Sequence, residues 1–185
     1  GMIQKDKDKI GDRLFGQNIT LVDDPDNKSI LYPRHVGLNG VARQRMDFIE
    51  QGVLKNLCYS DKLDADRFDR EINNSWDSLN LLMESGDGPG TFQEMVEKTK
   101  ERTLYIPYLH YMNFPNATKG EITASSRFGT FLIENGKVLH HLYNLRILDS
   151  LLNIFNNVVW LSSNIQPVNV ADTYGLRMAQ AISCP

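Results

Sequence analysis

Two stretches in which apolar runs flank an amide-glycine pair predict β-hairpins. In the later stretch, 130–133 is rich in β-branched and aromatic residues, Asn135-Gly136 interrupts the run, and Lys137-Val138-Leu139 resumes it. A type I′ turn needs positive φ at both central residues, and Asn and Gly tolerate positive φ best. We expect the return strand to run on through Leu142 and Tyr143.

The earlier stretch repeats the same phrase. Residues 41–49 lead to Glu50-Gln51-Gly52, and 53–59 form the expected return strand. Both stretches read Ile, Glu, an amide residue and Gly, followed by a short run with Val-Leu. The repetition indicates two related hairpins in one sheet system, and chance repetition in a β-rich chain is the alternative.

Between the two hairpins the apolar spacing becomes helical. Apolar residues over 63–83 approximate one helical face, although Asn73-Asn74-Ser75 interrupts it. They are Leu63, Phe68, Ile72, Trp76, Leu79 and Met83. After a glycine-rich break at 86–90, Thr91 and Glu94 form a capping-box pattern, which predicts a helix over 92–102.

Shorter patterns predict the remaining elements. Apolar runs predict strands at 19–22, 29–32 and 158–161, and residues 121–126 lead into the second hairpin. A strand over 104–112 contains Pro107, which cannot donate to a ladder, so we expect an edge strand or a bulge there. Residues 113–120 form an expected turn region. Over 147–155 the spacing predicts a helix that starts near Asp149-Ser150 and ends at Asn156-Asn157.

Together these elements predict an α+β fold. We expect mainly antiparallel β-sheet, sandwich-like or as a partly open barrel, with two or three helices packed outside. Residues 1–13 are expected to be a tag scar and a flexible N-terminus, and 14–185 a single domain with a helical insertion at about 61–102. Two facing sheets would bury Phe48, Ile49, Phe131, Ile133, Val158 and Trp160.

The composition excludes several classes of function. The chain has 185 residues, 41% hydrophobic and 23% charged, with a net charge of −3, as in an ordinary globular protein. Lys and Arg are scattered, which argues against a nucleic-acid partner. No apolar stretch is long enough to span a membrane, and the first residues do not resemble a signal peptide, so we expect a cytoplasmic protein.

The residues that could carry chemistry share no catalytic spacing. The histidines match no metal motif, and two adjacent residues on a strand point to opposite faces. Neither cysteine lies in a nucleophile context, and the glycine-rich 86–90 lacks the Lys-Ser/Thr of a P-loop. These candidates are His35, His110, His140, His141, Cys58 and Cys184. We predict no catalytic and no metal-ligating residue, and assign no peptide- or partner-binding residue.

The order of the motifs resembles that of a known family. Residues 129–138 read Gly-Thr-Phe-Leu-Ile-Glu-Asn-Gly-Lys-Val, followed by Asn144-Leu145-Arg146 and Ser150-Leu151-Leu152. Upstream, Gly40-Val41-Ala42-Arg43-Gln44-Arg45 leads into the hairpin at 49–55. Over roughly 36–165 the chain resembles the C-terminal domain of the TldD/PmbA family, the so-called modulators of DNA gyrase.

The resemblance implies a peptidase system that processes small or partly unfolded peptides, in which a zinc-bearing subunit pairs with a related metal-free subunit. In zinc-bearing members the ligands are a His-Glu-x-x-x-His helix and a cysteine of the C-terminal domain. This chain lacks that helix motif, its aligned loop 168–175 has no cysteine, and Cys184 lies too far along. The resemblance therefore implies a fragment of a longer chain or a metal-free subunit, without zinc or another cofactor and without hydrolysis of its own.

Two functions from different classes stay open. One is a non-catalytic C-terminal domain of a peptidase complex, which shapes a chamber or holds extended peptides by strand addition, as a homodimer or with a zinc-bearing subunit. The other is a stand-alone β-rich binding or assembly module. In either case we expect no nucleic acid and no membrane, and the edge at 104–112 is the expected place for dimerisation or peptide pairing.

Overall fold

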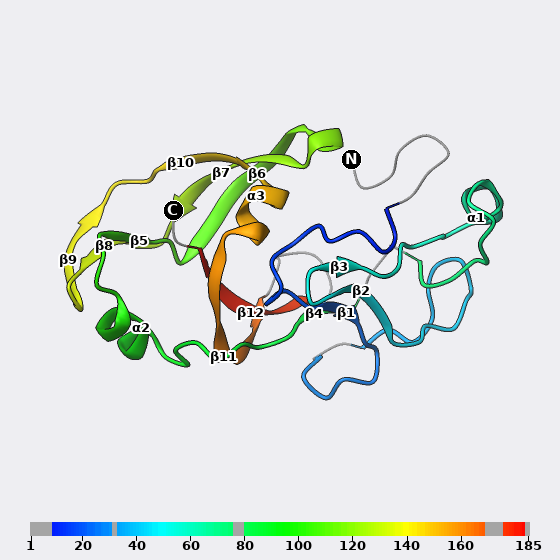
Figure 1. Cartoon of the computed structure of the whole chain (residues 1–185), viewed down its shortest axis with the longest axis horizontal. Helices are drawn as coiled ribbons and strands as arrows, with labels where there is room; N and C mark the ends of the chain where they lie inside the picture. Colours follow the sequence, from blue (N-terminus) through cyan, green and yellow to red (C-terminus); the bar gives the residue numbers. More distant parts are fainter. Residues whose placement is uncertain (1–8, 31–32, 76–79, 169–175, 184–185) are drawn as a thin grey trace.

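Three sheets and three α-helices form the described part of the chain, which is residues 9–30, 33–75, 80–168 and 176–183 of a computed structural model. Almost all strand pairs are antiparallel, and no sheet in this part closes into a barrel. The fold is therefore α+β, as the sequence predicts. Figure 1 shows strands β1 to β3 and helix α1 toward one end of the molecule, and the β8–β9 hairpin with helix α2 at the other.

The largest sheet has six strands in the order β11-β12-β4-β1-β2-β3. They are β1 (Leu21–Asp23), β2 (Met46–Glu50), β3 (Val53–Leu54), β4 (Leu81–Met83), β11 (Val158–Val168) and β12 (Leu176–Ser183). Strand β1 pairs antiparallel with β2 on one side and with β4 on the other. The sheet thus joins segments from both ends of the described chain.

The other two sheets are halves of one bent ribbon, residues 103–150. One half is β5 (Thr103–Tyr105), β8 (Thr130–Glu134) and β9 (Lys137–Leu142), and the other is β6 (Tyr108–Asn116), β7 (Glu121–Arg127) and β10 (Arg146–Ser150). The strand orders are β5-β8-β9 and β6-β7-β10. They correspond because the chain crosses from one half to the other three times, from β5 to β6, from β7 to β8 and from β9 to β10. Figure 1 shows the ribbon arching from the β8–β9 end back toward the middle of the molecule.

Both predicted hairpin turns are confirmed, but they lie in different sheets, and the first return strand, predicted over 53–59, ends at Leu54. Gln51 and Gly52 have φ of 47° and 82°, and Asn135 and Gly136 have φ of 50° and 75°, as a type I′ turn requires. The first turn joins β2 to β3 in the six-stranded sheet, and the second joins β8 to β9 in the ribbon. The expectation of one shared sheet system was wrong, since a repeated turn phrase fixes local geometry and not the pairing partner.

Pro107 divides the predicted strand 104–112 into two. Strands β5 and β6 belong to different halves of the ribbon, and each is an edge strand, as the proline predicts. The predicted turn region 113–120 was too long, because β6 continues to Asn116 and only the 3-10 helix η1 (Ala117–Lys119) turns the chain.

The long helical face predicted over 63–83 was wrong. Helix α1 (Lys62–Arg67) ends after six residues, and β4 occupies the end of the range as a strand. The side chains of Asn73 and Asn74 bind backbone groups of Leu57, Tyr59 and Gln44, so they hold this segment in an irregular conformation instead of a helix. Of the predicted strand 29–32, residues 29 and 30 are not strand and the rest lies outside the described residues.

The predicted helix over 147–155 is half strand. Arg146–Ser150 is strand β10, and helix α3 (Leu151–Asn156) begins only where the Ser150 hydroxyl accepts a hydrogen bond from the Asn153 amide. Its predicted end at Asn156-Asn157 is confirmed. Apolar pairs three and four apart fit a helix, but here the first pair belongs to a strand whose Leu148 faces solvent.

Helix α2 (Phe92–Lys98) starts where the capping pattern predicts and ends four residues earlier. The Thr91 hydroxyl accepts from the Glu94 amide at 3.2 Å, and the Glu94 carboxylate accepts from the Gly90 amide at 2.8 Å. Thr91→Ala should therefore destabilise the domain by about 1 kcal/mol in urea unfolding. Thr91→Ser keeps the cap and should stay close to the unsubstituted protein; an equal loss in both variants would contradict the capping role.

Of the six predicted core residues, Phe131 is only half-buried and lies in neither buried cluster, and the other five are divided between two clusters. Ile49 and Val158 are buried in a cluster between the six-stranded sheet and the chain around Phe15, with Phe48 packed against it. Ile133 is buried with Met95 and Val96 of α2, where Trp160 packs. A single sandwich core over these residues was wrong, because the bent ribbon packs on α2 and not face to face on the large sheet. The predicted domain boundaries remain a prediction.

Candidate functional site

The most buried polar residues form a structural network around Asp23. Its side chain and that of Arg43 are fully buried and lie 3.1 Å apart. Asp23 also accepts from the Asn74 side chain at 2.9 Å and from the Asn80 backbone amide at 2.7 Å. Every carboxylate oxygen is thus satisfied from within the fold, so this network connects β1 to three loops and offers no reactive group.

The predicted metal candidates do not come together. Within the described residues no three His, Cys, Asp or Glu side chains lie close enough to hold a metal ion. His140 and His141 follow one another on β9 and are exposed, while His35 pairs with Asp26 at the surface. The described candidates are therefore not arranged to hold one metal ion together. Cys184 and 169–175 of the aligned loop lie outside the described residues.

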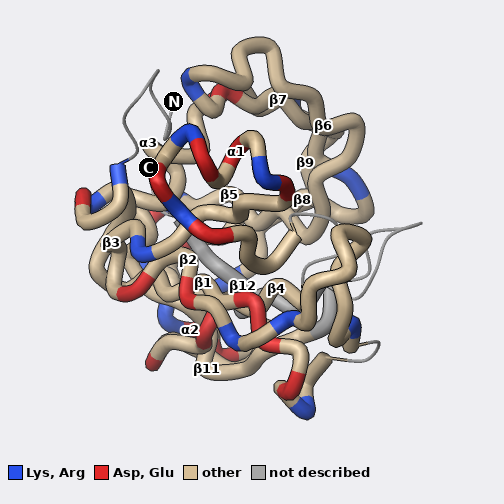
Figure 2. The backbone as a smooth tube through the Cα atoms, turned by 90° about the vertical axis from the view of Figure 1, so that its right-hand side faces the viewer, with Lys and Arg blue, Asp and Glu red and all other residues tan. Residues whose placement is uncertain are grey.

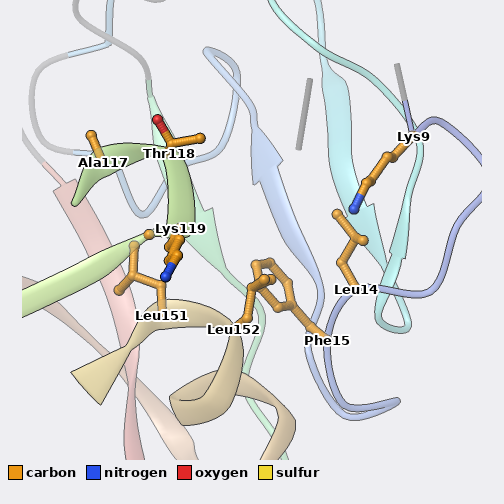
Figure 3. A pocket seen from close by; sticks show the side chains of 9 residues that line it. Lys9, Leu14, Phe15, Ala117, Thr118, Lys119, Leu151 and Leu152 are labelled. Atoms are coloured by element: carbon orange, nitrogen blue, oxygen red, sulfur yellow. The ribbon is translucent and has the colours of Figure 1, made fainter. Parts of the chain in front are cut away.

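A small cavity of about 140 Å³ lies between helix α3, helix η1 and the N-terminal segment. In Figure 3, Phe15 and Leu152 lie side by side, with Leu14 and Lys9 toward one end and Leu151 and Lys119 toward the other. The lining is mostly apolar, and its polar side chains are Lys9, Thr118 and Lys119.

The pKa shifts follow from surface ion pairs of the six-stranded sheet. Lys55 donates to Glu50 at 2.9 Å across the first hairpin and lowers the pKa of that carboxyl. Partial burial lowers the pKa of Arg45, but the carboxylates of Asp47, Glu84 and Asp24 outweigh it, so that the pKa is raised. Figure 2 shows basic and acidic residues interspersed along the backbone. Both shifts favour the charged forms of these surface groups.

The ribbon has two open edges, and the expected one is irregular. Strand β6 shifts register against β7 between His110 and Asn113 and again between Asn113 and Asn116. Tyr111 within the first shift has φ of 51°, and Pro115 lies within the second. Bulges and prolines are the usual means by which edge strands avoid pairing with another chain. The edge at 104–112 is therefore present as predicted, but β6 is poorly shaped for strand addition.

Strand β10 forms the regular open edge. Its five residues pair with β7 without any register shift, and it lies last in its sheet. At its ends, Leu145 accepts from the Ser126 amide, and Leu151 donates to the Gly120 carbonyl. Since N–H and C=O groups alternate between the two sides of a strand, those of Arg146 and Leu148 point away from β7. The Leu148 side chain is 70% exposed.

Sequence reasoning missed β10 as a candidate edge. The apolar residues at 147–148 and 151–152 matched helical spacing, so the strand was assigned to a helix. The signal that could have found it is Asp149-Ser150 followed three residues later by Asn153, since Ser150 is a good N-cap and Asp149 then precedes the helix.

Comparison with known proteins identifies the family. A model of the PmbA/TldA metallopeptidase C-terminal domain matches residues 3–184. The chain therefore belongs to this family, in the part that forms its C-terminal domain. It is 29% identical over 141 residues to MJ0231, an uncharacterized protein of Methanocaldococcus jannaschii, which covers 72% of this chain and 32% of that protein.

Solved structures share the fold. TldE from Thermococcus kodakarensis superposes with a TM-score of 0.74 at 19% identity, over 94% of this chain and 39% of that one. A proposed modulator of a DNA gyrase from Thermotoga maritima superposes with a TM-score of 0.72 at 18% identity, over 94% of this chain and 39% of that one. The chain thus spans about a third of the length of its curated relative and about two fifths of these structures. No helix among the described residues is long and apolar enough to cross a membrane.

Proposed function

We propose that this domain holds an extended polypeptide by strand addition at the β10 edge and serves a peptidase complex without hydrolysing peptides itself. The observation that carries the proposal is the regular outer side of β10, where the backbone groups of Arg146 and Leu148 point away from the sheet. An added strand would satisfy these groups, and main-chain hydrogen bonds of this kind give affinity for many sequences. Family membership weighs against a stand-alone module.

Leu148→Pro should weaken peptide binding about tenfold while leaving the fold intact. Proline removes the Leu148 N–H, which makes no bond to β7, and proline is tolerated where a strand's N–H faces solvent. The probe is a mixed pool of fluorescein-labelled decapeptides, followed by fluorescence anisotropy. Circular dichroism and urea unfolding check the fold of the variant.

Leu148→Ala is the matched control, because it removes the same side chain and keeps the outward N–H. Its affinity for the decapeptide pool should stay within about threefold of that of the unsubstituted protein. Binding by Leu148→Pro at the original affinity, with its fold intact, would contradict strand addition at β10.

The lack of hydrolysis is tested on the same probes. The decapeptides should keep their full mass after incubation with the protein and zinc, because the described residues contain no cluster of His, Cys, Asp or Glu that could hold a zinc ion to activate water. Cleavage that co-purifies with the chain would overturn the non-catalytic role. Pairing with a second copy or with a zinc-bearing subunit, and a cytoplasmic location, stay predictions; the mass of the protein in solution checks the first.

A further inference from the structure

We infer that the outward face of the β10-β7-β6 sheet binds a carboxylate of the polypeptide, and this inference rests on the function proposed above. The relevant residues, called here the basic face, are His110, Thr123, Ser125, Arg127 and Arg146. They lie next to the β10 edge on which the polypeptide is proposed to pair.

Strand register brings these side chains together. Arg146 of β10 and His110 of β6 both oppose Ser125 of β7, so the three form one row across the sheet. Directly opposed side chains have Cβ atoms about 4.5–5.5 Å apart. Arg127 lies two positions along β7 and therefore on the same face, while the intervening Ser126 is buried on the opposite face.

Hydroxyl groups, and no carboxylate, orient Arg146. Its Nε donates to the Thr123 hydroxyl at 2.8 Å, and one terminal nitrogen donates to the Ser125 hydroxyl at 3.3 Å. The guanidinium keeps further N–H groups for a ligand, and the Ser125 hydroxyl, which accepts from Arg146, still has its own hydrogen to donate. A planar guanidinium matches the two oxygens of a carboxylate.

The other half of the basic face leaves polar atoms without partners. The Arg127 guanidinium lies 5.3 Å from the centre of the Tyr111 ring, and that ring meets His110 edge-on at 4.1 Å. Arg127 Nε and His110 Nδ1 are both enclosed and form no hydrogen bond in the described structure. Tyr111, which lies in the first register shift of β6, has a positive φ of 51°.

The positive charge of this face is not balanced by the described residues. Neither Arg127 nor Arg146 forms an ion pair there, whereas Arg45 alone lies within 3.4 Å of three carboxylates. On the same face of β7, Glu121 is two positions from Thr123, about 7 Å along the strand, and it forms no ion pair with either arginine in the described structure. Like charges on neighbouring strands repel each other, and a bound oxyanion would remove this repulsion.

Three labelled decapeptides test the inference by anisotropy. The first has no acidic residue and a C-terminal amide, the second has the same sequence with a free C-terminal carboxylate, and the third is the amide with one glutamate. One or both of the acidic peptides should bind about tenfold more tightly than the neutral one. Tighter binding of the second peptide alone would indicate a terminal carboxylate, and tighter binding of the third alone would indicate a side-chain carboxylate.

Arg146→Gln and Arg127→Gln should each reduce this preference, the ratio of the affinities for the acidic and the neutral peptide, severalfold. Arg102→Gln is the matched control, since Arg102 directly precedes β5 of the other half of the ribbon and pairs with Glu134 of β8, and it should keep the preference. Equal binding of all three peptides, or a preference that survives the double Arg127→Gln and Arg146→Gln variant, would overturn the carboxylate site while the proposed function stands.

The remaining outcomes separate the two proposals. Failure of even the neutral peptide to bind contradicts strand addition itself. A third outcome is that millimolar inorganic phosphate displaces the bound peptides although all three peptides bind equally. The basic face would then be a site for free phosphate, and the inferred peptide-carboxylate site would be overturned.

Discussion

Asp23→Ala should destabilise the domain by about 3–5 kcal/mol, the largest loss we expect from a single polar substitution. The Asp23 carboxylate accepts four hydrogen bonds, one from Arg43, one from the Asn74 side chain and two from Asn80. Its removal leaves the Arg43 guanidinium buried without its countercharge and leaves the amide donors unsatisfied. The shift of the urea unfolding midpoint measures the loss.

Asp26→Ala is the matched control for Asp23→Ala. Asp26 also pairs with a base, His35, at 3.3 Å, but its side chain is 86% exposed. Exposed pairs contribute at most about 1 kcal/mol, so this variant should unfold close to the unsubstituted protein. If Asp23→Ala lowered the unfolding free energy no more than Asp26→Ala, the buried network would not stabilise the fold as described above.

The second large effect is expected at Gly52, where a methyl group has no space. A Cβ on Gly52 would lie 2.2 Å from the Phe15 carbonyl oxygen and 2.7 Å from that of Gly16. The Gly52 carbonyl also accepts from Leu14 and Phe15, so the N-terminal segment cannot move away without breaking these bonds. Adding the strain of an alanine at a φ of 82° to this overlap, Gly52→Ala should cost about 3 kcal/mol or more.

The second hairpin supplies the control for this glycine. Gly136 occupies the same turn position with φ of 75°, but the nearest atom to its Cβ would be 3.5 Å away. Gly136→Ala should therefore cost only the backbone strain, about 1–2 kcal/mol. Guanidinium unfolding of both variants measures the difference in stability. Equal losses of unfolding free energy would show that contact with Phe15 and Gly16 does not constrain the first hairpin.

The sequence predicted local geometry better than pairing. The two turns, the N-cap at Thr91 and the edge character at Pro107 each depend on one or two residues whose backbone preferences are strong. The sheet partners of the hairpins and the network around Asp23 depend on residues 20–57 positions apart, for which no local pattern exists. The irregular chain around Asn73 and Asn74 replaced a predicted helix for the same reason.

The candidate site was less accessible from the sequence than the fold. The resemblance to the family led to strand addition as an expected function, but it pointed to 104–112 as the edge. The bulges in β6 follow from a register with β7 that only the assembled ribbon defines. Likewise Arg127 and Arg146 are 19 positions apart, and a shared face of β7 and β10 is what brings them together.

Amide hydrogen exchange by NMR tests the central claim most directly. With saturating decapeptide, the amides of Arg146 and Leu148 should exchange at least about tenfold more slowly, because an added strand would accept their hydrogen bonds. The Ile147 amide, which points toward β7, should change much less and serves as the internal reference. Unchanged exchange at Arg146 and Leu148, or protection confined to β6, would contradict strand addition at the β10 edge.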